Sequence, residues 1–100
     1  MPALKNISSV LRNELPYLRK VYGVKRIALF GSYARGTQKK GSDVDLFVEL
    51  EKPLGLSFMD FSDHLEKRTG RKVDIITSEG LRSIRVKKVA EDIKRGLVYV

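Results

Sequence analysis

The chain has 100 residues, with 20 Lys and Arg against 12 Asp and Glu, a net charge of +8 and no cysteine. This length predicts one domain over residues 1–100, and the absence of cysteine excludes disulfides, a thiolate nucleophile and a cysteine-ligated zinc site. The positive charge favours an anionic partner, although a solvated basic surface explains it equally well. No apolar run is long enough for a membrane span or resembles a signal peptide, so we expect a cytoplasmic protein without membrane contact.

An amphipathic helix is predicted over residues 4–22. Its apolar side chains recur every three or four positions, at Leu4, Ile7, Leu11, Leu15, Leu18 and Tyr22. Pro16 is expected to kink this helix or to split it in two, because proline has no backbone N–H to donate. Gly23 is suited to the C-cap.

A strand, a short helix and a loop are expected next. The sequence VKRIALF, residues 24–30, is apolar and partly β-branched, which is typical of a buried strand. Gly31 and Ser32 end that strand, and Ser32 is expected to N-cap a short helix that runs to about Arg35. The polar, glycine-bounded residues 36–42 predict a loop.

Two further strands are predicted, one with carboxylates at its start and one with a carboxylate in its middle. The sequence DVDLFVEL, residues 43–50, alternates at first and then becomes apolar, which indicates one wet and one buried end. The sequence RKVDIIT, residues 71–77, predicts the third strand. The last residues, LVYV, form either a short strand or an apolar tail.

Two more helices separate and follow these strands. The first is expected to end near Gly70, with Phe58, Phe61, Leu65 and, as a further candidate, Met59 on its core face. The second is predicted over residues 81–95 and ends at Gly96, with a core face of Ile84, Val86, Val89, Ala90 and Ile93. His64, the only histidine, is expected to be a packing or surface residue.

Helices that alternate with strands predict an α/β (α+β) fold, with a small sheet flanked by helices. Only a helical turn and a loop separate the first two strands, which is too short for a parallel crossover. We therefore expect a mixed sheet.

Three aspartates are the candidate metal ligands. Asp43 and Asp45 are two positions apart on a strand, so their side chains share one face and their charges repel unless a cation lies between them. Asp74 interrupts an otherwise apolar strand, and if that strand lies beside residues 43–50 the three carboxylates can hold two ions, Mg²⁺ or Mn²⁺. The alternatives are a turn role for Asp43 and edge-strand charges for Asp45 and Asp74.

Gly31 and Ser32 are candidates for phosphate binding. Glycine lets the backbone approach a bulky ligand, and the N–H groups at the start of the following helix favour an anion. The Ser32 hydroxyl adds a donor. A phosphate site beside a carboxylate-held metal is suited to phosphoryl or nucleotidyl transfer.

The stretch GSYARGTQKKGSDVD consists of G-S, ten residues and D-x-D, and VDIIT follows at residues 73–77. This composite resembles the motif of the nucleotidyltransferase superfamily typified by DNA polymerase β. The sequences FGSYARG and SDVDLFVEL are similar to those of the minimal nucleotidyltransferases, which often pair as antitoxins with HEPN-domain toxins. The resemblance implies a polymerase β-like nucleotidyltransferase fold.

The resemblance also implies roles for individual residues. Asp43 and Asp45 match the paired metal ligands, and Asp74 matches the third carboxylate, which helps to activate the attacking hydroxyl. Gly31 and Ser32 match the pair that binds the triphosphate. Arg35 lies in the A-R-G sequence common in this family and is expected to face the phosphates.

The function implied is Mg²⁺-dependent transfer of AMP from ATP to a hydroxyl, with a Tyr of a cognate HEPN toxin as the expected acceptor. Adding this bulky anion would silence the toxin. One alternative is a non-catalytic antitoxin that neutralises its partner by forming a complex, because no second domain is present to grip a base or polymer. For the assembly of the chain, a homo-oligomer and a hetero-oligomer both stay open. Another is nucleotide addition to an RNA 3′ end, which the net charge supports.

Overall fold

The structure is a computed structural model that describes residues 4–39, 41–83 and 87–100. The helices are α1 (Leu4–Tyr22), α2 (Gly31–Arg35), α3 (Ser57–Thr69), α4 (Ser78–Arg82) and α5 (Lys87–Arg95). The strands are β1 (Val24–Phe30), β2 (Val44–Leu50), β3 (Val73–Thr77) and β4 (Val98–Tyr99). Within the described ranges, no helix combines the length and apolar character that a membrane crossing requires.

The strands form one mixed sheet in the order β3-β2-β1-β4. Strand β1 is antiparallel to both β2 and β4, whereas β2 and β3 are parallel. The mixed sheet expected from the short connection between the first two strands is therefore confirmed, and the last four residues contribute a strand rather than a tail.

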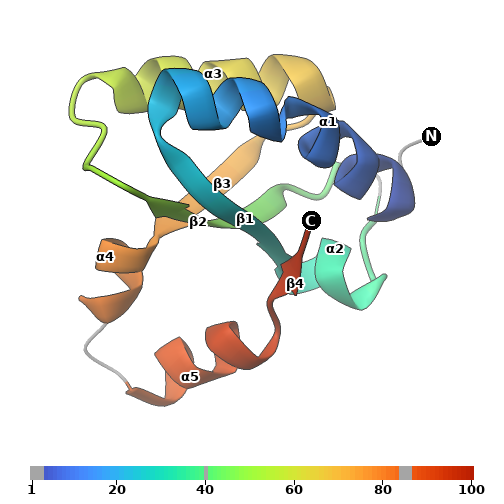
Figure 1. The fold of residues 1–100 in the computed structure, drawn as a ribbon. Helices are drawn as coiled ribbons and strands as arrows, with labels where there is room; N and C mark the ends of the chain where they lie inside the picture. The colour runs from blue at the N-terminus through green and yellow to red at the C-terminus, as the bar shows by residue number, and fades with distance from the viewer. Residues whose placement is uncertain (1–3, 40, 84–86) are drawn as a thin grey trace.

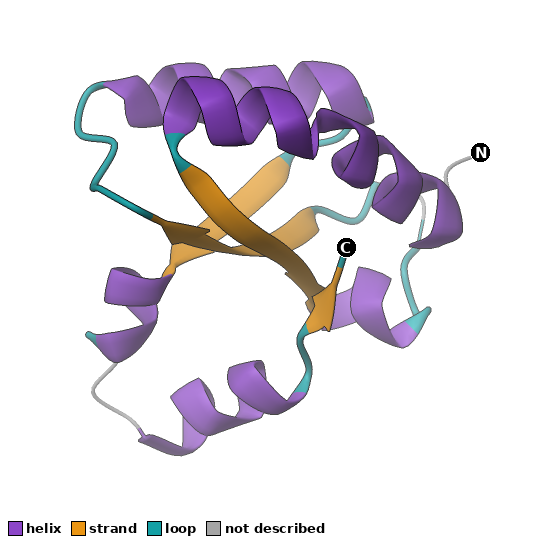
Figure 2. Cartoon of the chain, viewed as in Figure 1, coloured by secondary structure: helices purple, strands orange, loops and turns teal. Residues whose placement is uncertain are grey.

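Helices α1 and α3 lie side by side across one face of the sheet, and α4 and α5 lie on the other side (Figures 1 and 2). Alternation along β2 divides its side chains between these faces. Val44, Leu46 and Val48 belong to the main core with α1 and α3, whereas Phe47 packs with Ala28 and Leu81 on the opposite side. Asp45, one position from Leu46 and two from Phe47, consequently lies on the face away from α1 and α3.

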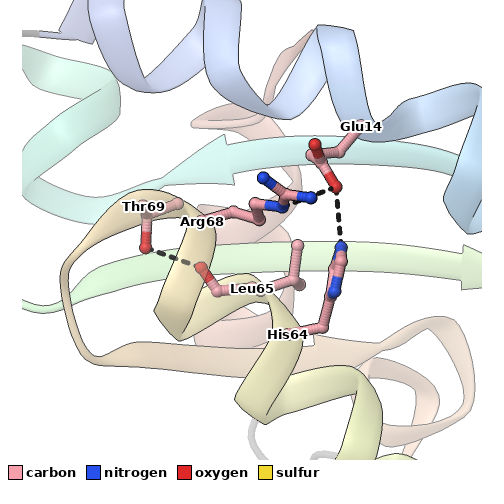
Figure 3. A network of polar contacts seen from close by, with 5 residues as sticks. All are labelled: Glu14, His64, Leu65, Arg68 and Thr69. Carbon is pink, nitrogen blue, oxygen red and sulfur yellow. Dashed lines mark hydrogen bonds and ion pairs between the residues drawn. The ribbon is translucent and has the colours of Figure 1, made fainter.

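The interface between α1 and α3 combines apolar and polar contacts. Phe61 and Leu65 are fully buried, and each such side chain contributes roughly 1.5–3 kcal/mol by leaving water. At the edge of this interface, Glu14 Oε1 lies 2.6 Å from His64 Nε2 and 3.5 Å from Arg68 Nε (Figure 3). The ring of His64 also stacks on Tyr17 at 4.9 Å. The packing role expected for His64 is confirmed.

Two local expectations were wrong, and a third was wrong in part. Of the two outcomes expected at Pro16 the split is excluded, because α1 continues through it; proline lies on the exposed side of the helix, where water can bind the carbonyl left without a partner. Ser32 does not cap α2: the helix begins one residue earlier, at Gly31, and Phe30 at the N-cap position makes no side-chain bond. Met59 is 67% exposed and lies outside the core.

The single helix predicted over residues 81–95 is also wrong, because α4 and α5 are separate helices. Helix α4 begins directly after β3, where the Thr77 hydroxyl accepts a hydrogen bond from the Gly80 N–H at 3.1 Å. Ile84 and Val86 lie outside the described residues, as does the Val89 side chain. Ala90 and Ile93 pack against the cluster around Phe47, as their spacing predicted.

Candidate active site

Strand pairing brings three of the predicted residues to one end of the sheet. Phe30, the last residue of β1, is paired with Asp45 on β2, and Asp45 is paired with Asp74 on β3. Gly31 follows Phe30 directly, so the Gly31 backbone and both carboxylates lie in one row across three strands. Asp43 is just ahead of β2, at the same end of the sheet.

The Asp45 carboxyl is the electrostatic centre of this row. Its pKa is raised, first by burial and then by the negative charges of Asp74 and Asp43, while the positive charge of Arg35 lowers it. These influences show that all four side chains are close enough to interact. The folded chain thus concentrates negative charge that a bound cation would offset.

Gly31 allows the close approach of the backbone to Asp45. A Cβ atom at this position would lie 2.2 Å from Asp45 Oδ2, well inside van der Waals contact. Gly31 also has φ of +71°, in the left-handed region that glycine adopts most readily. Glycine is therefore required here by both the backbone conformation and the space beside the carboxylate.

The donor set of the carboxylates matches a magnesium ion that would take its remaining ligands from water and substrate. Among the residues that the structure describes, no three acidic, His or Cys side chains converge tightly enough to enclose an ion by themselves. Mg²⁺ is usually held by only one or two carboxylates together with water and substrate phosphates. Asp45, with Asp43 or Asp74 beside it, supplies that kind of partial site.

The predicted phosphate-binding residues lie on α2, with Gly31 and Ser32 at its start and Arg35 at its end. Ser32 is half-buried, and its carbonyl accepts hydrogen bonds from the N–H groups of Gly36 and Thr37, which close the end of this short helix. Arg35 is exposed and close enough to Asp45 to lower its pKa. Both residues lie on the helix that follows β1 at the carboxylate end of the sheet, and their phosphate-binding role stays a prediction.

Two hollows border the row, and they contain residues that the sequence analysis missed. One, of about 210 Å³, is lined by Phe30, Gly31, Arg35, Asp92, Ile93 and Gly96. The other, of about 340 Å³, is lined by Gly41, Ser42, Asp43, Gly70, Arg71 and Lys72. The position of Arg71, three residues before Asp74, could have indicated that it lies near the carboxylates. Nothing in the local sequence associates Asp92 with Gly31.

Two larger hollows, of about 450 and 500 Å³, lie at the opposite end of β2, around residues 50–55. Their linings include none of the six predicted site residues. Size alone would therefore have directed attention away from the carboxylates, whose end of the sheet is shallow and open.

Comparisons with known proteins agree with the motif. The family model described as "Nucleotidyltransferase domain" matches residues 9–100. A protein of Methanocaldococcus jannaschii, provisionally named a protein adenylyltransferase, is 41% identical over 103 residues, which cover 100% of both chains. Protein adenylyltransferase MntA of Thermococcus cleftensis is 38% identical over 101 residues, covering 100% of this chain and 98% of its own.

Solved structures show the same fold. A structure provisionally described as a minimal nucleotidyltransferase has a TM-score of 0.75 at 28% identity, covering 97% of this chain and 95% of its own. A chain from a crystal structure described as a toxin–antitoxin with AMP-PNP has a TM-score of 0.56 at 29% identity. That match covers 72% of this chain and 58% of the other.

Proposed function

The chain belongs to the nucleotidyltransferase domain family and is an enzyme of that class, and from this premise we propose that it transfers AMP from ATP to a hydroxyl of a partner toxin, acting as its antitoxin. The observation that carries the proposal is the register that sets Asp45 beside Asp74 and against the Gly31 backbone. Carboxylates and a close backbone approach at one sheet end suit a nucleoside triphosphate and its cation.

The proposed step forms one bond and breaks one. The acceptor hydroxyl oxygen attacks the α-phosphorus of ATP, the bond from the α-phosphorus to the bridging oxygen breaks, and pyrophosphate leaves. Asp74 is exposed at the edge of the row, where an acceptor can reach it, and its carboxylate takes the hydroxyl proton. Gly31 and Ser32 hold the β- and γ-phosphates in line with the attacking oxygen, and Arg35 faces the phosphates.

Asp43, Asp45 and Asp74 would hold the magnesium, with two ions expected. When bound, Mg²⁺ supplies positive charge that neutralises the phosphates and stabilises the charge that develops on them. The carboxylates would position that charge beside the phosphates, and it would offset the negative charges of Asp74 and Asp43 around Asp45.

The proposed acceptor is a Tyr hydroxyl of a HEPN-domain toxin. A relative that is 38% identical is named MntA, a protein adenylyltransferase, and a structural neighbour is described as a toxin–antitoxin. The net charge of +8 suits a partner with an acidic surface. Arg71 and Lys72, which share a hollow with Asp43, offer positive charge on the side of the row away from Arg35.

The experiment incubates the protein with α-labelled ATP, Mg²⁺ and the product of the neighbouring gene, whose sequence is first checked for a HEPN domain. We expect label on the partner, lost by at least about a hundredfold in Asp45→Asn, because the site then lacks a ligand and a charge. Asp63→Asn is the matched control, since Asp63 is an exposed carboxylate on α3, outside the row.

Other outcomes of the same experiment identify the alternatives. Label on RNA rather than on protein would favour RNA 3′-end transfer. A stable complex without label, formed equally well by Asp45→Asn, would show a non-catalytic antitoxin. Transfer that persists in Asp45→Asn would contradict the assignment of the carboxylate row.

A further inference from the structure

A small hollow connects the carboxylate row with the C-terminal part of the chain. Strand β4 pairs with β1, with Val98 opposite Leu29, and this places the end of α5 beside the end of β1. The resulting hollow of about 210 Å³ has Gly31 and Arg35 on one side and Asp92 and Ile93 on the other. Its two sides are about sixty residues apart in the chain.

Beyond Gly31 and Arg35, which face the row, the lining of this hollow differs from that of a phosphate site. Phe30 and Ile93 are partly buried and pack against the cluster around Phe47, so they form apolar walls. Asp92 is the only carboxylate in the lining and would repel a phosphate, but it accepts hydrogen bonds from hydroxyl groups. A group with apolar faces and neighbouring hydroxyls matches these walls better than a phosphate does.

The size and position of the hollow restrict its occupant further. Pockets for drug-sized ligands usually measure roughly 300–1,000 Å³, so a hollow of about 210 Å³ takes only part of a nucleotide. Gly31 borders the hollow and its backbone also lies against the Asp45 carboxylate, so a nucleotide with its phosphates on the row can extend its sugar into the hollow.

We infer that the hollow between α5 and the start of α2 binds the ribose of the donor nucleotide, and that Asp92 accepts hydrogen bonds from the 2′- and 3′-hydroxyls. The inference rests on the proposed function, because it assumes a nucleoside triphosphate on the carboxylate row. A carboxylate that binds ribose hydroxyls is the device by which dinucleotide-binding folds recognise their sugar. The chain would accordingly select ribonucleotides over deoxyribonucleotides.

The neighbouring residue Glu91 provides a matched control. The side chains of Asp92 and Glu91 are 59% and 60% exposed, and they lie 3.8 and 3.6 Å from Arg95. Only Asp92 lines the hollow. Asp92→Ala and Glu91→Ala therefore each remove one exposed carboxylate and its ion pair with Arg95. Only Asp92→Ala also removes the proposed acceptor of the ribose hydrogen bonds.

The test measures equilibrium binding of ATP and of 2′,3′-dideoxy-ATP by calorimetry, with Mg²⁺ present and no acceptor. We expect wild type and Glu91→Ala to bind ATP about tenfold more tightly than the dideoxy compound, as hydrogen bonds to a charged group predict. In Asp92→Ala the two affinities should agree to within about twofold. ATP then loses the hydrogen bonds to Asp92, whereas dideoxy-ATP, which has no ribose hydroxyls, never made them.

Three results would overturn the inference: equal affinities in wild type, a tenfold preference that survives in Asp92→Ala, or the same loss in Glu91→Ala. Each of these leaves nucleotide binding, and with it the proposed function, intact. If wild type binds neither nucleotide, the proposed function fails and the inference fails with it. Binding is measured without transfer, so an inactive but nucleotide-bound protein still decides the question.

Discussion

At the scale of single residues, the surroundings of Asp45 in the folded protein disfavour the negative charge of its carboxylate. Burial and two neighbouring carboxylates raise its pKa, so the native state binds a proton more tightly than the unfolded chain does. Such a group lowers the free energy of unfolding as pH rises through the interval between its unfolded and its folded pKa. Above that interval the free energy of unfolding falls no further on account of this group, so the whole destabilisation is present at neutral pH.

Asp45→Asn should therefore stabilise the protein at pH 7 when metal and nucleotide are absent. We expect a gain of at most about 1 kcal/mol, because the half-buried carboxylate is screened by water. Chemical denaturation at pH 7 measures the gain, and the difference between the two proteins should vanish near pH 3, where both side chains are neutral. A variant less stable than wild type at pH 7 would contradict this account.

Substitutions at Gly31 and Gly36, at the two ends of α2, distinguish the effect of backbone strain from the effect of a steric collision. Their φ angles are +71° and +73°, so Ala at either position adopts a left-handed conformation that costs about 1–2 kcal/mol. A Cβ atom at Gly36 meets nothing within 4 Å, whereas one at Gly31 collides with the Asp45 carboxylate. Only Gly31→Ala should also displace Asp45.

We expect both variants to lose similar stability from backbone strain, with a further loss in Gly31→Ala. Transfer activity should fall at least tenfold in Gly31→Ala and should stay within about twofold of wild type in Gly36→Ala. Parallel thermal denaturation and activity assays make the comparison. Equal activity in the two variants would show that the close approach of Gly31 to Asp45 has no functional role.

At the scale of elements, the contacts between α1 and α3 support the sheet without entering the site. Glu14, His64 and Arg68 link the two helices at the edge of the main core, and Tyr17 stacks on the imidazole (Figure 3). These residues lie on the face of the sheet opposite Asp45. Stability and nucleotide binding should therefore be separable by substitution here.

His64→Ala is expected to destabilise the protein by about 1–3 kcal/mol, because it removes a charged hydrogen bond and leaves Glu14 without one partner. Affinity for ATP should not change. Asp63→Asn, one position away on α3 and exposed, should change neither quantity. Denaturation curves and calorimetry on the three proteins test this, and weaker ATP binding in His64→Ala would show coupling between the helices and the site.

At the scale of the whole molecule, the aromatic side chains argue against a platform for single-stranded RNA. Tyr17 and Tyr99 are the exposed aromatic residues within the described ranges, at 47% and 44%. Tyr17 is already stacked on His64, and Tyr99 lies under the Arg26 guanidinium at 4.6 Å. The net charge of +8 remains as the source of attraction for RNA.

We therefore expect any binding of oligoadenylate to be electrostatic and to weaken steeply between roughly 50 and 200 mM salt. A Tyr17→Ala/Tyr99→Ala double variant should bind with unchanged affinity, since base stacking contributes little. Fluorescence anisotropy over a salt series measures both effects. Affinity that resists salt, or that the double variant loses, would revive the hypothesis of RNA 3′-end transfer.

The sequence by itself determined the element types, the mixed sheet and the family, because these depend on local periodicity and on a compact motif. The strand at 24–30 follows from its apolar and β-branched composition, and the helix that ends before Gly70 follows from the spacing of its apolar residues. The motif named six site residues, and the structure places Asp45, Asp74 and Gly31 in one row, while their roles stay predictions. The break between α4 and α5 was missed, because the helical spacing continues across it.

Only the tertiary structure decided which distant residues meet. The parallel register of β2 and β3 sets Asp74 beside Asp45, and the pairing of Val98 with Leu29 sets Asp92 beside Gly31. Such contacts depend on how strands pair across the whole sheet, and the free energy of that pairing is shared among many side chains. No local pattern in the sequence therefore encodes them, and the second wall of the proposed nucleotide site became visible only in the folded chain.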